Sequence, residues 1–171
     1  AGEEPKLIKG PDIFLEVIKA LKPHYDDIAV LLTGPARGFV MKGLDEINVD
    51  YYHYNLEDYS EISHYYRALD LYLITAREEG GPRAVLESMA SGLPIACSNL
   101  SSMPEILGDG GVYFNPLDIE DIQDSLKDLI DSKKKREEVA RKAYKRAESY
   151  SWDKASLNTF SFINDVFEEK K

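Results

Sequence analysis

Two glutamates, Glu79 and Glu87, enclose a short stretch with several groups able to bind an anion, EGGPRAVLE. The adjacent glycines let a ligand approach the backbone closely, and the free N–H groups at the start of a following helix attract negative charge. Arg83 falls in the first turn of that helix, where a cation opposes the helix dipole at a cost of roughly 0.3–1 kcal/mol. A bound anion would remove this conflict, and a solvated surface arginine is the alternative. The stretch therefore predicts a phosphate-type site.

The same stretch joins two predicted strands. An apolar run at residues 71–75 precedes it, and a second run at residues 95–97 follows it. Between them apolar residues recur at helical spacing, Pro82 suits the first helical position, and Gly92 with Pro94 ends the helix. The order strand, loop, helix, strand places the two glycines at the carboxyl end of the first strand.

The rest of the chain repeats this alternation. Further strands are expected at residues 28–33, 49–54 and 112–114, and helices at residues 11–22, 39–47, 59–69, 101–106, 119–131, 133–149 and about 152–169. Short turns between such elements predict an α/β fold with a doubly wound, mostly parallel sheet and helices on both faces. A ligand then binds at the carboxyl ends of the strands, which is where the glycine loop lies.

With the run that follows it, SMASGLPIACS, the stretch resembles the paired-glutamate motif of the retaining GT-B glycosyltransferases, in particular family 4, the glycosyl transferases group 1. The spacing of the glutamates, the glycines after the first one and the Leu-Glu-x-Met-Ala-x-Gly-x-Pro run make the match specific. The resemblance implies a Rossmann-like domain that forms one half of a GT-B fold. It implies a retaining hexosyltransferase that binds a nucleotide diphosphate sugar as donor, with no cofactor and no metal required by the motif.

The resemblance also assigns roles to individual residues. Glu87 would bind the ribose of the donor nucleotide, and Glu79 would lie near the transferred sugar. Lys9, which precedes Gly10, would reach the donor diphosphate, so Lys9 and Glu79 are the expected catalytic residues. The loop and the first helical turn would hold the diphosphate and the sugar, and this segment comprises Gly80, Gly81, Pro82, Arg83, Ala84 and Val85.

Two further assignments are less direct. Tyr54 ends the strand expected at residues 49–54, the third of the family pattern, and Asn55 follows it. The loop after this strand lies beside the nucleoside base in the family, although a tyrosine cluster more often serves packing. Near the start of the chain the family has an arginine where this sequence has Glu3. Either the phosphate clamp is weaker here, or Lys6 or Arg83 supplies the second positive charge.

The resemblance covers nearly all of residues 1–171, as the C-terminal, nucleotide-sugar-binding domain. The family's central first strand would lie immediately upstream of this sequence, after an N-terminal acceptor domain. The closing helix, from about residue 152 to 169, would pack on that domain. We therefore expect the chain alone to bind donor but to transfer no sugar, and we expect membrane association only through the missing domain.

Composition excludes other classes. A net charge of −10, from 31 acidic and 21 basic side chains, argues against a nucleic-acid partner. No apolar run approaches the roughly 18 residues of a membrane span, and the sequence starts without a signal-peptide core, so a cytoplasmic location is expected. Cys97, the single cysteine, fits a small buried residue in a reducing compartment. The three histidines show no metal-ligand spacing.

Three other functions fit parts of the pattern. A sugar phosphorylase of similar fold would usually need a lysine for a pyridoxal cofactor, and no candidate stands out. An NAD-dependent Rossmann enzyme would need a glycine fingerprint, and GEEPKLIKG is not one. A non-catalytic domain that binds a nucleotide or a protein partner is supported mainly by Glu3.

Overall fold

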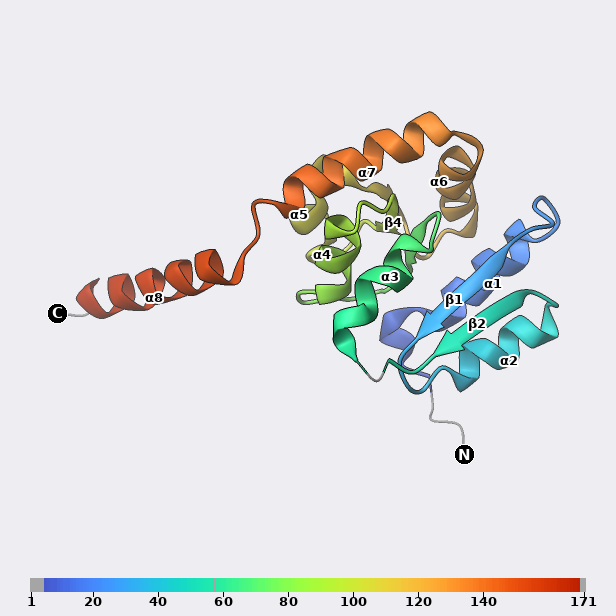
Figure 1. Cartoon of the computed structure of the whole chain (residues 1–171), viewed down its shortest axis with the longest axis horizontal. Coiled ribbons are helices and arrows are strands. Elements are labelled where there is room, and N and C mark those ends of the chain that lie inside the picture. Colours follow the sequence, from blue (N-terminus) through green and yellow to red (C-terminus); the bar gives the residue numbers. More distant parts are fainter. Residues whose placement is uncertain (1–4, 57, 170–171) are drawn as a thin grey trace.

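The computed structural model describes residues 5–56 and 58–169, so Gly2 and Glu3 lie outside the described residues. Strands and helices alternate along most of the chain (Figure 1). The strands are β1 (Ala29–Thr33), β2 (Asp50–Tyr54), β3 (Tyr72–Ile74), β4 (Ile95–Ser98) and β5 (Val112–Phe114). The α-helices are α1 (Pro11–Leu21), α2 (Gly38–Glu46), α3 (Ile62–Arg67), α4 (Arg83–Ala90), α5 (Met103–Leu107), α6 (Ile119–Asp131), α7 (Lys133–Ala147) and α8 (Trp152–Glu169), with short 3₁₀ helices η1 (Leu7–Lys9), η2 (Tyr59–Glu61) and η3 (Gly108–Gly110).

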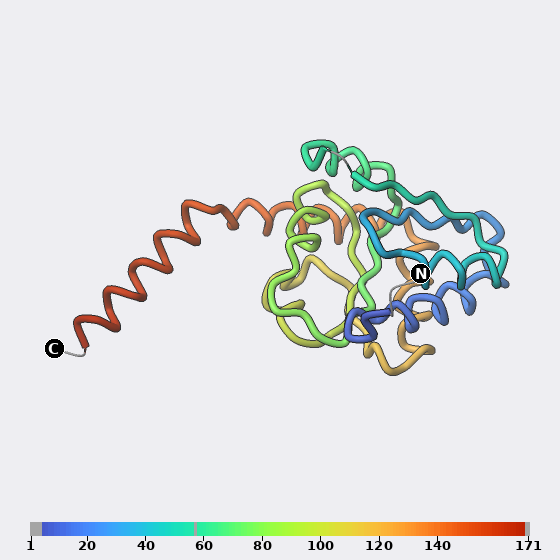
Figure 2. The backbone as a smooth tube through the Cα atoms, turned by 90° about the horizontal axis from the view of Figure 1, so that it is seen from below, coloured from blue at the N-terminus to red at the C-terminus, as the bar shows by residue number. Residues whose placement is uncertain are grey.

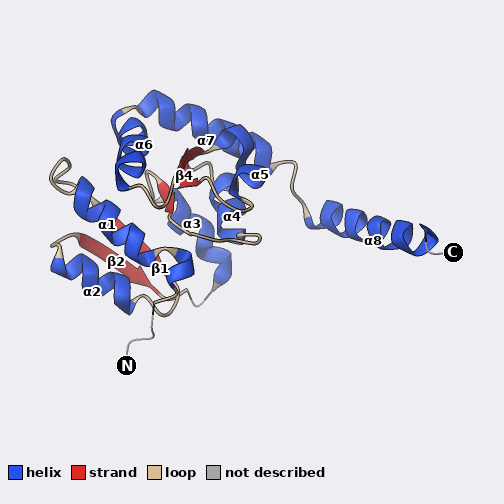
Figure 3. Cartoon of the chain, turned by 180° about the vertical axis from the view of Figure 1, so that it is seen from behind, coloured by secondary structure: helices blue, strands red, loops and turns tan. Residues whose placement is uncertain are grey.

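Strand β4 shows why helices cover both faces of the sheet. All four of its residues are buried, and successive side chains of a strand point to opposite faces. Ala96 faces a core formed with α1 and α6, whereas Ile95 and Cys97 face a second core formed with α4, α5 and α7. The predicted α/β class with parallel strands and helices on both sides is confirmed, and Figure 3 shows helices on several sides of β4.

The strands form two parallel sheets instead of the single continuous sheet expected from the sequence. β1 pairs with β2, and β3, β4 and β5 pair in that order. A small hollow of about 60 Å³ lies between the two sheets. It is lined by Leu31 and Thr33 of β1, Tyr72 of β3, and Ile62, Tyr65, Tyr66 and Leu69 in and after α3. Within the described part of the chain, one edge of β1 and one edge of β3 therefore carry no neighbouring strand.

Element boundaries follow the sequence closely, with two corrections. Helix α4 begins at Arg83, because Pro82 has extended backbone angles (φ −73°, ψ 106°) and is the N-cap, not the first helical residue. The segment expected to be one helix at 59–69 is a 3₁₀ turn followed by the shorter α3. The Asp58 side chain accepts a hydrogen bond from the N–H of Ser60, which stabilises a tight turn at this point.

Helix α8 extends away from the body of the protein (Figures 1 and 2). Its large apolar side chains are exposed to solvent. Trp152 is 81% exposed, and Leu157, Phe160, Phe162 and Ile163 are between 55% and 71% exposed. No helix in the described ranges combines the length and apolar character that crossing a membrane requires.

Candidate functional site

Two loops that are far apart in the sequence lie side by side at the carboxyl end of β3. The first carries Lys9 and Gly10 before α1, and the second follows β3. The buried Thr75 hydroxyl donates a hydrogen bond of 2.8 Å to the carbonyl of Gly10, and the N–H of Arg77 donates one of 2.9 Å to the carbonyl of Ile8. Gly10 has φ +66°, in the left-handed region, so the chain can turn sharply between η1 and α1 at this contact. These bonds fix the Lys9 loop against the β3 loop.

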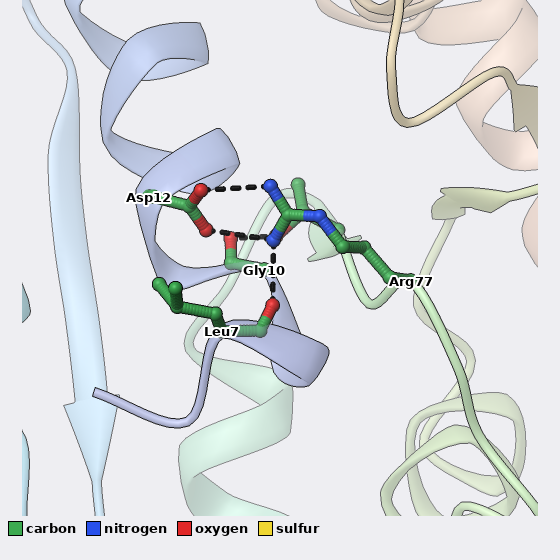
Figure 4. A network of polar contacts seen from close by, with 5 residues as sticks. Leu7, Gly10, Asp12 and Arg77 are labelled. Carbon is green, nitrogen blue, oxygen red and sulfur yellow. Dashed lines mark hydrogen bonds and ion pairs between the residues drawn. The ribbon is translucent and has the colours of Figure 1, made fainter. Parts of the chain in front are cut away.

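Arg77 strengthens this junction with its side chain, as Figure 4 shows. Its guanidinium donates two hydrogen bonds to the carboxylate of Asp12, at 2.7 and 2.9 Å, and one of 2.5 Å to the carbonyl of Leu7. The pKa of Asp12 lies below its ordinary value of 3.8, mainly because Arg77 hydrogen-bonds the charged carboxylate. The ion pair therefore stabilises the folded chain above about pH 4 and loses its contribution as the pH falls below that value.

The junction brings together the two residues that the sequence singled out as catalytic. Lys9 Nζ lies 2.8 Å from Glu79 Oε1, with the lysine side chain 51% exposed and the glutamate side chain 18% exposed. The Ser102 hydroxyl donates a hydrogen bond to the Glu79 carbonyl, which ties the β3 loop to the segment before α5. An exposed ammonium held beside a more buried carboxylate can meet a phosphate from the solvent side, because lysine binds phosphate as a point charge.

The start of α4 borders this pair. Gly80 and Gly81 are exposed, and a Cβ atom added to either one would meet no atom within 4 Å. Neither has a positive φ, so the fold itself does not require glycine at these two positions. Arg83 is exposed at the first position of α4, and in the described part of the chain it forms no ion pair. The open backbone and the unpaired cation both favour a ligand that approaches from the solvent.

Glu87 lies one turn further along α4 and is held by two tyrosines. The Tyr59 hydroxyl donates a hydrogen bond of 2.5 Å to Oε1, and the Tyr66 hydroxyl donates one of 3.1 Å to Oε2. Burial raises the pKa of Tyr66 above its ordinary value, and the charge of Glu87 adds to the rise. Both tyrosines therefore remain protonated donors, and the carboxylate keeps free lone pairs for further donors.

The two residues expected to contact the base and the single cysteine have different surroundings. Tyr54 ends β2 and packs its ring against Tyr65 of α3 at 5.4 Å, while Asn55 is exposed beside it. Cys97 is buried as predicted, and burial raises the pKa of its thiol to about 12, which makes it unreactive. In the described ranges, no three His, Cys, Asp or Glu side chains come together as metal ligands.

Sequence reasoning missed the residues that hold the site together. Arg77, Asp12 and Thr75 join the two loops, and Tyr59 and Tyr66 hold Glu87. The only signal for Arg77 was its position just after a predicted strand, in a loop already suspected of binding a ligand.

Replacing Arg77 with methionine is expected to destabilise the chain by about 1–2 kcal/mol, because the variant loses charge-assisted bonds to Asp12 and Leu7. The Lys9 loop should also loosen, so affinity for a nucleoside diphosphate should fall. Thermal unfolding and calorimetric titration measure the two effects. Arg141→Met, which changes an exposed arginine on α7, is the matched control. Equal melting temperatures for the two variants would contradict the role given to Arg77.

The α/β fold, with parallel strands and helices on both sides, is shared with solved GT-B glycosyltransferases. Residues 5–146 match the family model described as Glycosyl transferases group 1, and the chain belongs to this family.

Three known proteins illustrate the similarity. O-antigen chain mannosyltransferase B of Escherichia coli is 27% identical over 101 residues, which cover 59% of this chain and 26% of that protein. D-inositol 3-phosphate glycosyltransferase of Paenarthrobacter aurescens is 24% identical over 175 residues, covering 93% of this chain and 41% of that protein. The solved C-terminal domain of the glycosyl transferase group 1 family protein LpcC from Francisella tularensis has a TM-score of 0.71 at 23% identity, covering 85% of this chain and 80% of that structure. The chain thus spans less than half the length of these two curated relatives.

Proposed function

We propose that this domain binds a nucleoside diphosphate sugar and provides the donor side of a retaining hexosyl transfer. The observation that carries the proposal is the contact of 2.8 Å between Lys9 and Glu79, beside the open glycine backbone at the start of α4. A lysine, free amides and a helix N-terminus together suit a diphosphate, and the net charge of −10 means that this positive site is local.

The roles follow from the charges that develop during transfer. When the bond between the sugar and the diphosphate breaks, negative charge grows on the leaving phosphate, and Lys9 with the amides after Gly80 stabilises it. Glu79, paired with Lys9, lies near the anomeric carbon, where an oxocarbenium-like positive charge develops. Glu87 binds the ribose hydroxyls, and Tyr54 with Asn55 contacts the base. Arg83 supplies the second cation near the diphosphate.

The acceptor side of the reaction belongs to a partner domain of the same polypeptide. The exposed apolar face of α8 supports this, since burying such a surface is strongly favourable. The empty place between β1 and β3 supports it as well. Doubly wound sheets commonly have the strand order 3-2-1-4-5-6, and the order found here lacks only position 1. A parallel strand contributed by the partner domain's part of the polypeptide could pair with the open edges of β1 and β3 and join the two sheets.

Transfer then needs both domains, because the acceptor hydroxyl must be held against the anomeric carbon in a cleft that excludes water. The chain alone should therefore bind donor without transferring sugar. Incubation with nucleotide sugar and candidate acceptors, compared with a longer protein that includes the partner domain, tests this division. Efficient transfer by residues 1–171 alone would overturn it.

Calorimetric titration with UDP-, GDP- and ADP-glucose tests the proposed donor site directly. One base should bind clearly better than the others, and Lys9→Met should weaken the nucleoside diphosphate at least tenfold while leaving the nucleoside unchanged. Lys42→Met, which changes an exposed lysine on α2, should alter neither affinity. If no nucleotide binds, the donor function is wrong; if Lys9→Met weakens nucleoside and diphosphate equally, Lys9 is not the phosphate ligand.

A further inference from the structure

Both carboxylate oxygens of Glu87 accept a hydrogen bond from a tyrosine hydroxyl, and the two tyrosines differ in their surroundings. Tyr66 is 8% exposed, and its ring packs edge-on against Tyr72 at a centroid distance of 5.6 Å. Tyr59 is 55% exposed and belongs to the short 3₁₀ turn η2 before α3. Tyr66 is therefore held by packing on several sides, whereas Tyr59 can leave Glu87 at little cost in buried surface.

The hydroxyl of Tyr59 offers Glu87 the same chemistry as a ribose hydroxyl. Each is an O–H donor, and a ribose diol that binds a carboxylate needs acceptor sites on its two oxygens. In the structure, the Tyr59 hydroxyl occupies Oε1 at 2.5 Å. A nucleotide that brings its ribose to Glu87 must share this oxygen with Tyr59 or displace it.

We propose that the hydrogen bond from Tyr59 to Glu87 competes with the ribose and is displaced by it, and we call this bond the latch. Tyr66 is the positioning residue that keeps Glu87 aligned for the ribose. This inference rests on the proposed donor function. Tyr66 packs from α3 onto the edge of β3, so it keeps its bond to Oε2 in both states.

The latch lowers the affinity for ribonucleotides, compared with a site in which no bond from Tyr59 to Glu87 has to break. A ligand that must first open a closed state binds more weakly in proportion to the open fraction. Removing the Tyr59 hydroxyl abolishes the competing bond, whereas removing the Tyr66 hydroxyl lets the carboxylate turn away. The two phenylalanine variants should therefore change affinity in opposite directions, a result that loss of folding cannot produce.

The experiment titrates wild-type protein, Tyr59→Phe and Tyr66→Phe with UDP, GDP and ADP and with their 2′,3′-dideoxy forms. For the base that binds, Tyr59→Phe should raise ribonucleotide affinity about three- to tenfold and Tyr66→Phe should lower it by a similar factor. Neither variant should change the affinity for the dideoxy form by more than about twofold, because that ligand lacks the hydroxyls. Tyr144→Phe, on the exposed tyrosine of α7, is the matched control.

NMR of ring-labelled tyrosines gives a second readout. The Tyr59 signal, identified by its loss in Tyr59→Phe, should shift when the ribonucleotide is added and stay in place with the dideoxy form. If wild-type protein binds, but Tyr59→Phe has the same affinity and the Tyr59 signal of wild-type protein does not shift with the ribonucleotide, the latch is wrong and the donor function stands. If only Tyr59→Phe binds, the latch is supported. If neither protein binds any nucleotide, both proposals are wrong.

Discussion

Replacing Glu87 with glutamine is expected to weaken binding of the preferred nucleoside diphosphate roughly ten- to hundredfold. A carboxylate that accepts two hydroxyl hydrogen bonds contributes about 1.5–3 kcal/mol, and each 1.4 kcal/mol corresponds to a factor of about ten in affinity. Glutamine keeps the shape and one acceptor oxygen but lacks the charge. Calorimetric titration measures the loss, and the dideoxy nucleotide should show little of it.

Glutamine is a cleaner test than alanine at this position. Glu87→Ala would leave the buried Tyr66 hydroxyl without its acceptor, which costs about 1–3 kcal/mol of folding stability. A fall in nucleotide affinity could then not be separated from a loss of folded protein. Glu46→Gln, on the exposed face of α2, is the control for the change of charge alone. A folded Glu87→Gln protein with unchanged affinity would remove Glu87 from the donor site.

Most of the architecture could be predicted because it depends on local pattern. The apolar run of β4 is buried on both faces, and the periodic apolar positions of α6 give a helix with the predicted bounds. The anion site proposed at the start of α4 also depends on neighbours in sequence, namely two glycines and a helix N-terminus, and it stays a prediction. Local rules describe such features well because the groups involved are adjacent in the chain.

The contacts that organise the site could not be predicted, because they join distant segments. Arg77 is 65 residues from Asp12 in sequence, and Tyr59 is 28 residues from Glu87. A surface arginine and an exposed tyrosine have many possible partners, and only the tertiary packing of the loops selects one. The division into two sheets was also beyond the sequence pattern, since β1 and β3 each carry an apolar run typical of a central strand.

The sequence raised the question of what partner Arg83 has at the start of α4. The sequence showed that a cation at the start of α4 opposes the helix dipole, and it offered an anion or a solvated surface as the reason. In the structure Arg83 forms no ion pair with Glu87, one turn later, and the Glu87 carboxylate accepts hydrogen bonds from Tyr59 and Tyr66 instead. Arg83 is exposed at the first position of α4, so within the described residues no ion pair relieves its conflict with the dipole.

Replacing Gly10 with alanine is expected to destabilise the chain by about 3–5 kcal/mol. Gly10 has φ +66°, a conformation that costs an L-residue roughly 1–2 kcal/mol. A Cβ atom would also lie 1.9 Å from the carbonyl oxygen of Thr75, so the two loops would have to separate. Separation breaks the bond from the Thr75 hydroxyl to the Gly10 carbonyl and strains the neighbouring bond from Arg77 to Ile8.

Gly92→Ala separates the two causes. Gly92 has a similar φ of +73°, but a Cβ atom there would meet nothing within 4 Å, so only the conformational cost of about 1–2 kcal/mol applies. Thermal unfolding should therefore show a fall in Tm for Gly10→Ala roughly two to three times that for Gly92→Ala. Nucleotide affinity at a temperature where both variants are folded should fall only for Gly10→Ala, because only that change moves Lys9 away from Glu79. Equal losses of stability would mean that the Lys9 loop yields without disturbing Thr75, and the close junction of the two loops would then not be what positions the lysine.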